Sequence, residues 1–311
     1  FGEGYWFHFL WKILMFGFFN WAWTTFVAKT VTFHPRAGNM PLRADGITPR
    51  EWSPKCVYLG RALQGVTLNA VGLTNRGVPW TLAKGRWQKR REPFFLSFMP
   101  VGETREDRLE ELRLFLLELA RQVHAFEAPF GLQLNLSCPN TGHETSHLSQ
   151  EAYAWLDEIG NHTALNNMPV LLKVSAFLRP TEAAEIGKHS RLDGFVCSNT
   201  IAWKDLDTFG INTRDVFGTD SSPLQALGGG GFSGSQMVPI VCKWIRELRA
   251  MGFTKVVIGE NGIRRPRHAI QMLEAGANGI GIGSMAIIRP WMLLPTTIAV
   301  YHHLATRTKP V

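Results

Sequence analysis

The sequence contains few cysteines, no Cys-x-x-Cys pair and only one dense run of basic residues. Its four cysteines (Cys56, Cys138, Cys197 and Cys242) are scattered over 311 residues. This spacing fits neither a metal site nor a disulfide framework, and it favours a reducing, cytoplasmic setting. The formal net charge of +8 favours anionic partners. The basic run at 84–91 is typical of a solvated surface, so we expect no nucleic-acid partner.

The sequence shows no pattern of a secretory signal peptide or of an interdomain linker, so we expect neither. Residues 1–4 contain no basic start region, and no cleavage site of small residues follows. Residues 5–23 are unusually aromatic but carry His8, Lys12 and Asn20, and the stretch is barely long enough to span a bilayer. We interpret it as an amphipathic helix lying against the fold, with contact to a membrane surface or a subunit as the alternative. Without a Pro/Ser-rich linker, residues 1–311 are expected to form one domain.

Apolar segments of strand length alternate with helical patterns along the whole chain. This alternation predicts a parallel α/β sheet with crossover helices. Seven strands are one short of an eight-stranded barrel, and an open doubly wound sheet would accommodate the same count. Long insertions at 32–93 and 199–235 follow two strands, where a barrel of this class builds its active site. The expected strands are 25–31, 94–99, 131–136, 170–174, 194–197, 255–258 and 279–282, and the expected helices are 105–126, 151–162, 181–189, 236–251, 265–275 and 290–304.

The segment Asn-Leu-Ser-Cys-Pro-Asn at 135–140 has the most informative chemistry. The carboxamides of Asn135 and Asn140 both donate and accept hydrogen bonds, so they can hold the edges of a planar heterocycle. The thiol of Cys138 beside that edge could serve as a nucleophile or as a proton acceptor. Further carboxamides occur near strand ends at Asn69, Asn75 and Asn199, where turn formation is the simpler explanation.

Two glycine-rich turns follow the last two expected strands. Gly262 lies in the first turn, and Gly283 and Ser284 lie in the second. Backbone amides in such turns are suited to bind phosphate, and barrels commonly place a phosphate site after their seventh and eighth strands. Lys29 and Lys173 lie within apolar strands, where each needs an anionic or electron-rich neighbour. One anionic cofactor in the mouth of the barrel would satisfy both lysines.

Taken together, these segments resemble the dihydroorotate dehydrogenase family. The matching pieces run in family order over nearly the whole chain: FGEGY, FVAKTVT, PRAGNMPLR, NAVGLTNRGV, NLSCPN, the strand around Lys173, CSNT, GGGFSG, GENGI and GIGS. The resemblance implies a (β/α)8 TIM-type barrel that binds FMN and oxidises dihydroorotate to orotate in pyrimidine biosynthesis. It also implies a homodimer, or a partner subunit that carries FAD and an iron–sulfur cluster.

The resemblance further implies roles for individual residues. Cysteine at the base position is similar to the soluble branch of the family. Segments FGEGY and NAVGLTNRGV resemble the NAD-linked branch slightly more than the fumarate-linked one. The implied catalytic residues are Cys138 as the base and Lys29; the implied substrate ligands are Asn69, Asn135, Asn140, Asn199 and Thr200; and the implied cofactor ligands are Lys29, Asn135, Lys173, Gly231, Gly234, Gly262, Gly283 and Ser284.

Three departures from the family pattern leave alternatives open. Asn261 stands where the family has glycine, the run at 141–144 differs after the asparagine segment, and the family's first strand is expected to precede Phe1. The alternatives are a related flavin oxidoreductase acting on a dihydropyrimidine or uracil-type substrate, a flavin-free interaction protein, and a protein that binds membrane surfaces through its aromatic N-terminal segment.

Overall fold

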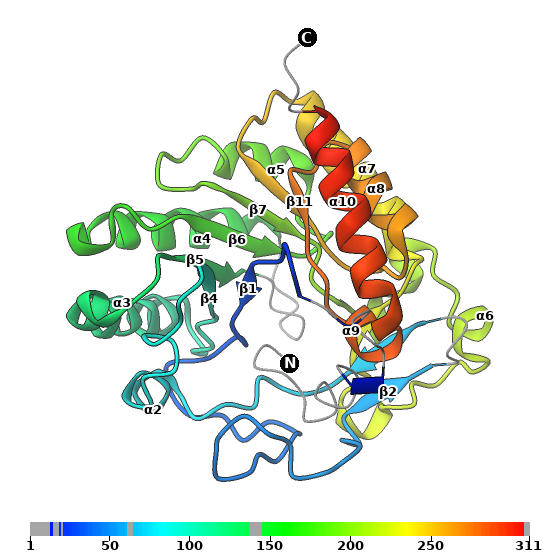
Figure 1. The fold of residues 1–311 in the computed structure, drawn as a ribbon, viewed down its shortest axis with the longest axis horizontal. Helices are drawn as coiled ribbons and strands as arrows, with labels where there is room; N and C mark the ends of the chain where they lie inside the picture. The colour runs from blue at the N-terminus through cyan, green and yellow to red at the C-terminus, as the bar shows by residue number, and fades with distance from the viewer. Residues whose placement is uncertain (1–12, 15–18, 20, 61–64, 137–144, 308–311) are drawn as a thin grey trace.

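The computed structural model describes residues 13–14, 19, 21–60, 65–136 and 145–307. Its main feature is a curled parallel sheet with helices on the outside, an α/β fold of the TIM type (Figure 1). The sheet contains, in spatial order, β1 (Phe26–Val27), β4 (Phe94–Phe98), β5 (Phe130–Asn135), β6 (Val170–Val174), β7 (Gly194–Cys197), β10 (Val256–Gly259) and β11 (Gly279–Ile280).

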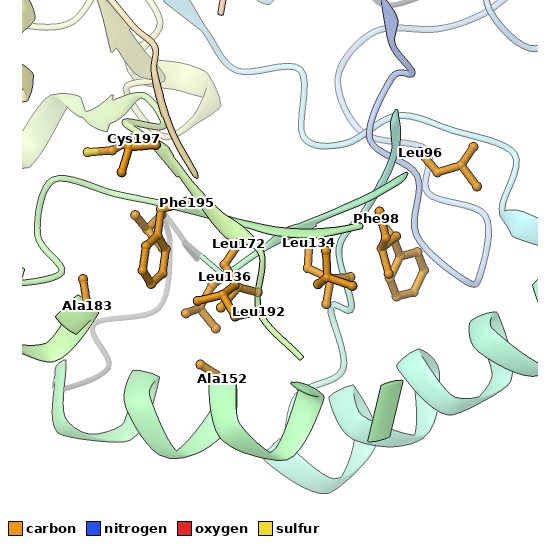
Figure 2. Close-up of a cluster of buried hydrophobic side chains, with 14 of the residues drawn as sticks. Leu96, Phe98, Leu134, Leu136, Ala152, Leu172, Ala183, Leu192, Phe195 and Cys197 are labelled. Atoms are coloured by element: carbon orange, nitrogen blue, oxygen red, sulfur yellow. The ribbon is translucent and has the colours of Figure 1, made fainter. Parts of the chain in front are cut away.

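Successive side chains of each strand point alternately to the helix-covered face of the sheet and to the barrel interior, as the two-residue period of a strand requires. Leu134 and Leu172 lie between the sheet and the helix that carries Ala152 (Figure 2), and Phe195 packs against the rings of Trp244 and Phe253. The side chains of Leu134, Leu172 and Phe195 are fully buried. Their sequence neighbours on the other face, among them Lys173, line the interior. One face of the sheet therefore stabilises the fold, and the other builds a site.

The helices that connect the strands cover the outer face of the sheet (Figure 1). The start of α3 is fixed by a capping box. Thr104 Oγ1 accepts a hydrogen bond from the Asp107 N–H, and the carboxylate of Asp107 accepts one from the Thr104 N–H. The outer helices are α3 (Arg105–Gln122), α4 (Thr145–Gly160), α5 (Pro180–Ile186), α7 (Met237–Ala250), α8 (Pro266–Glu274) and α10 (Leu293–Arg307). Shorter helices are α2 (Val78–Ala83), α6 (Thr213–Phe217) and α9 (Met285–Ile288), with 3-10 turns at Val123–Ala125, Thr163–Leu165, Trp203–Asp205, Asp207–Phe209, Gln225–Leu227 and Pro290–Met292.

A second sheet, which the sequence did not predict, is built from the two long insertions. Its four antiparallel strands are short, and they pair across a large separation in the chain. Leu68 and Phe232 lie opposite each other and are fully buried, so they form the centre of a separate small core. In spatial order the strands are β2 (Val57–Leu59), β3 (Thr67–Asn69), β9 (Gly231–Ser233) and β8 (Ile201–Ala202).

The parallel sheet is open between its edge strands. Within the described residues β1 pairs with β4 and β11 pairs with β10, and no pairing joins β1 to β11. The seven parallel strands agree with the sequence prediction. A family strand preceding Phe1 would lie outside this chain and stays a prediction. None of the helices in the described ranges is long and apolar enough to cross a membrane.

The first expected strand, at 25–31, is interrupted. Val27 pairs with Phe95, but the next pairing joins Val31 to Phe98, so four steps along one strand match three along the other. An extra residue of this kind bends a strand and re-aims its side chains. Lys29 and Thr30 lie in the part of the strand that contains this extra residue, and both line the interior.

Candidate active site

The interior of the curled sheet and its mouth form one cavity of about 1830 Å³. Inward-facing residues of the parallel strands make its wall, and loops of both insertions surround its mouth. This confirms the expectation that the insertions contribute to a site at the carboxyl ends of the strands. The cavity is larger than an ordinary ligand pocket because it continues through the interior, from the carboxyl ends of the strands to Pro169 near their amino ends.

Three of the four predicted substrate asparagines lie together at the mouth. Asn69 ends β3, Asn135 ends β5 and Asn199 follows β7, and all three line the cavity. The side chain of Asn69 donates to the carbonyl of Gly231 at 3.4 Å, and that of Asn199 accepts from the backbone of Thr200 at 2.9 Å. The cavity wall thus combines elements that are far apart in the sequence.

Cys138 and Asn140 lie outside the described residues, as does the departure from the family pattern at 141–144. The backbone leads toward them directly, because β5 ends at Asn135 on the wall of the cavity. Leu136 continues the pairing with β6 through a 2.9 Å hydrogen bond to the carbonyl of Lys173. The assignments of Cys138 and Asn140 therefore remain predictions.

Asn135 also belongs to a polar network inside the barrel. Its Nδ2 donates to Thr30 Oγ1 at 2.9 Å, and Thr30 Oγ1 lies 2.8 Å from Ser97 Oγ. Its Oδ1 is buried and has no hydrogen-bond partner among the described residues. Burying an acceptor without a partner is costly, so this atom requires a donor from a ligand or a water molecule. Sequence reasoning did not identify Thr30 or Ser97, whose roles depend on the neighbouring strands.

The two lysines in apolar strands both reach the cavity and both have partners within the chain. Lys29 Nζ donates to the carbonyl of Thr74. Lys173 Nζ forms an ion pair with Glu260 Oε2 at 2.7 Å. Glu260, which sequence reasoning did not single out, lies directly after β10 and also lines the cavity. An anionic cofactor is thus not the sole counter-charge available to Lys173.

The predicted glycine positions divide into two groups. Gly231 and Gly283 line the cavity. Gly234 and Gly262 meet behind it: a Cβ on Gly262 would lie 2.4 Å from the carbonyl oxygen of Gly234. Gly262 also has a φ of 83°, which glycine adopts without strain. This close approach joins the loops after β9 and β10, while Ser284 immediately precedes α9.

Asn261 takes the place of a family glycine without disrupting this turn. Its φ of 76° lies in the left-handed region, which asparagine tolerates better than most residues. The side chain is 8% exposed, and its Nδ2 donates to the carbonyl of Asn199 at 3.1 Å. Asn261 therefore connects the turn after β10 to the end of β7.

The remaining candidates have structural roles. Asn75 is buried, and its carboxamide donates to Thr32 Oγ1 and accepts from the Gly77 N–H. Burial raises the pKa of the Cys197 thiol well above its usual range, and the carboxylate of Glu260 adds to this shift. Cys197 is therefore protonated and inert. Across the described ranges, no group of three or more His, Cys, Asp or Glu side chains is arranged to hold a metal ion.

Comparison with known proteins identifies the family. The family model for dihydroorotate dehydrogenase matches residues 22–298. The chain belongs to the dihydroorotate dehydrogenase family. Members of this family are flavoproteins and oxidoreductases that act on the CH–CH bond of dihydroorotate, so the chain is an enzyme of this class.

The relatives of this chain include both NAD(+)-type and fumarate-type dihydroorotate dehydrogenases. The catalytic subunit of dihydroorotate dehydrogenase B (NAD(+)) from Latilactobacillus sakei subsp. sakei (strain 23K) is 29% identical over 273 residues, covering 86% of this chain and 76% of the relative. Dihydroorotate dehydrogenase A (fumarate) from Lactobacillus helveticus (strain DPC 4571) is 30% identical over 265 residues, covering 83% and 74%. The two identities do not separate the types.

A solved structure supports the fold alone. The crystal structure of the dihydroorotate dehydrogenase from Eimeria tenella in complex with ferulenol matches with a TM-score of 0.62 and 16% identity. The match covers 94% of this chain and 78% of that chain.

Proposed function

We propose that this chain binds FMN in the cavity and oxidises dihydroorotate to orotate. The observation that carries the proposal is the convergence of three asparagines and two lysines on one mouth, in a chain that belongs to this family. Asn69, Asn135 and Asn199 come from separate strands. A pyrimidine ring with a carboxylate presents several donors and acceptors in one plane, and carboxamides can match both kinds.

The residues of the cavity wall fit a flavin. The buried Oδ1 of Asn135 requires a donor, and Lys29 and Lys173 supply positive charge beside it. Gly283 leaves the wall without a side chain, where a broad ring or a ribityl chain would pass. Gly231 also lines the cavity, and its missing side chain makes room for Thr200. We assign the phosphate to the turn that carries Gly283 and Ser284, because Gly283 lies on the cavity wall and backbone amides in glycine turns bind anions. Gly234 and Gly262 meet behind the wall, and contact of either with the cofactor stays a prediction from the family resemblance. When bound, FMN supplies the acceptor for the hydride that leaves the substrate.

The chain itself supplies the proton chemistry and the binding. Cys138 removes the proton from C5 of dihydroorotate as a general base and forms no covalent bond to the substrate. Asn69, Asn135, Asn140 and Asn199 hold the pyrimidine, with Thr200 beside it. Lys29 binds at the same mouth, next to the ring. Asn69, Ala202 and Gly231 of the antiparallel sheet line the same cavity.

The electron acceptor that re-oxidises the reduced flavin depends on the branch of the family to which the chain belongs. We propose a soluble, cytoplasmic enzyme that forms a homodimer and passes electrons to fumarate, or to NAD through a partner subunit carrying FAD and an iron–sulfur cluster. Relatives of both kinds match this chain with similar identity. Steady-state turnover with fumarate, with NAD and with the partner subunit supplied would decide between these acceptors.

Replacement of Gly283 tests where FMN binds. Among the described residues, apart from its chain neighbours, none has an atom within 4 Å of the position of a Cβ on Gly283, so Gly283→Leu adds a side chain at the cavity wall without a clash with this part of the protein. We expect this variant to fold normally and to bind FMN at least about 100-fold more weakly, because a ligand cannot occupy the same space. The wild-type protein should be yellow and should lose its flavin absorbance when dihydroorotate is added without oxygen.

Gly160→Leu is the matched control. Gly160 ends α4 on the surface, and a Cβ there also meets nothing within 4 Å. This variant should retain FMN at the wild-type stoichiometry. Full flavin occupancy in Gly283→Leu would show that the phosphate and ribityl assignment is wrong. A wild-type protein that never binds FMN would refute the proposed function.

A further inference from the structure

We propose that Glu260 sets the charge that the active-site mouth presents to bound flavin, by neutralising Lys173. The inference rests on the proposed function, because it concerns the same cavity and the same cofactor. It assigns to Glu260 a tuning role, which follows from the ion pair at 2.7 Å and from the placement of both side chains on the cavity wall.

The backbone of Glu260 is held firmly in place. Its N–H donates to the carbonyl of Cys197 at 2.6 Å, and its carbonyl accepts from the N–H of Ser198 at 3.1 Å. These bonds continue the parallel ladder between β7 and β10 by one more residue. Glu260 therefore does not belong to a mobile turn, and its side chain leaves the sheet from a fixed position.

The neighbouring strand leaves room for the glutamate side chain. Gly281 follows β11, and a Cβ at this position would lie 3.0 Å from Cγ and 3.2 Å from Cδ of Glu260. Any larger residue at 281 would press on the glutamate. The absence of a side chain at Gly281 leaves space for the Glu260 side chain, whose carboxylate reaches past β7 to Lys173 on β6.

Lys173 lies in the wall of the cavity, where its charge acts on a bound ligand. It is paired in register with Asn135 of β5 and with Val196 of β7, so it is central in the wall of the cavity. The side chains of Lys173 and Glu260 are 16% and 23% exposed. Charges in such a half-buried position interact more strongly than in water. The pair therefore presents an almost neutral surface where Lys173 alone would present a full positive charge.

This neutralisation has a consequence for an electron-accepting ring. Two-electron reduction adds negative charge to a flavin, and a nearby cation stabilises the reduced form. The carboxylate of Glu260 offsets that effect. In Glu260→Gln the carboxamide keeps the size of the side chain and can still accept a hydrogen bond from Lys173, while the negative charge is removed. The variant should therefore bind the reduced flavin relatively more tightly than the wild type does.

The test uses FMN-loaded protein and two measurements that do not depend on turnover. Sulfite adds to the flavin ring and leaves negative charge on it, so its dissociation constant reports the local charge. We expect this constant to fall about tenfold in Glu260→Gln. A tenfold shift in the reduction equilibrium corresponds to a rise of about 30 mV in the two-electron potential. Glu260→Asp, which keeps the charge, should remain near the wild-type values.

Glu247→Gln is the matched control, because it removes the charge of a surface ion pair with Lys243 on α7. It should leave sulfite binding and potential unchanged. If Glu260→Gln binds FMN but matches Glu247→Gln in both measurements, the tuning role is wrong. If both variants shift equally, the effect is one of overall charge, and the tuning role is also wrong. If none of the proteins, wild type included, holds FMN, the proposed function itself fails.

Discussion

His268 should make the protein sensitive to mild acid. The side chain lies in the first turn of α8, is 5% exposed, and places Nδ1 3.2 Å from the carbonyl oxygen of Gly262. Burial lowers the pKa of His268 to about 4; the hydrogen bond to Gly262 opposes this shift, and nearby arginines, Arg265 foremost, add to it. The imidazole is therefore neutral in the folded protein and donates to Gly262.

The sign of the pH effect follows from proton binding. Between the unfolded pKa of His268, about 6.5, and its folded pKa of about 4, the unfolded chain binds a proton that the folded chain does not. Stability is therefore full above pH 6.5 and is lost as the pH falls toward 4. The unscreened shift would correspond to about 3 kcal/mol, which we reduce to about 1–2 kcal/mol for solvent screening.

The assay is urea unfolding followed by circular dichroism, from pH 7.5 to pH 4.5. His268→Asn keeps a neutral donor at the position of Nδ1 and cannot titrate. Its free energy of unfolding should fall about 1–2 kcal/mol less over this range than that of the wild type. The exposed His124, replaced in the same way, is the control and should follow the wild type. Parallel loss of stability in His268→Asn and wild type would refute the reasoning.

Two further predictions concern the substrate. Asn69→Ala or Asn199→Ala should weaken orotate binding by roughly one to two powers of ten without loss of FMN, since each removes a partner for a buried polar group. Titration of the flavin absorbance with orotate measures this affinity. An unchanged affinity in both variants would mean that Asn69 and Asn199 are ordinary turn residues. Cys138→Ala should bind FMN and orotate but reduce its flavin with dihydroorotate about 10²–10⁴-fold more slowly, as expected for a lost general base. Cys138→Ser should be slow near neutral pH and recover as the pH rises. Stopped-flow reduction at a near-normal rate in Cys138→Ala would rule out the assignment.

The parallel sheet could be predicted because its signals are local. Val170–Val174 and Gly194–Cys197 were predicted with the bounds that the structure shows, since both strands are apolar on the helix-facing side and bounded by turns. The predicted strand at 25–31 is too long, because no pattern within those seven residues indicates that one of them has no paired residue in β4. That information lies in the pairing partner.

The second sheet and the ion pair could not be predicted for the same physical reason. Strands of two or three residues, such as Ile201–Ala202, are too short to show alternation, and they form because a partner strand lies beside them. The sequence pattern places Glu260 in a glycine-rich turn and gives no sign of an ion pair. The link of Glu260 to Lys173 depends on β6 and β10 lying on either side of β7, which no local pattern encodes.

The pairing of β3 with β9 means that the two sheets cannot mature at the same time. Neighbours β4, β5, β6 and β7 follow one another along the chain, so this wall can assemble in the order of synthesis. The strand of Asn69 pairs locally with β2, but its other edge must wait for Gly231, 162 residues later. Non-local contacts of this kind form slowly and leave edges exposed in the meantime. A nascent chain would thus carry the β4–β7 part of its wall before β9 completes the antiparallel sheet and before β10 and β11 complete the parallel one, and the ability to hold a ligand would come late in its folding.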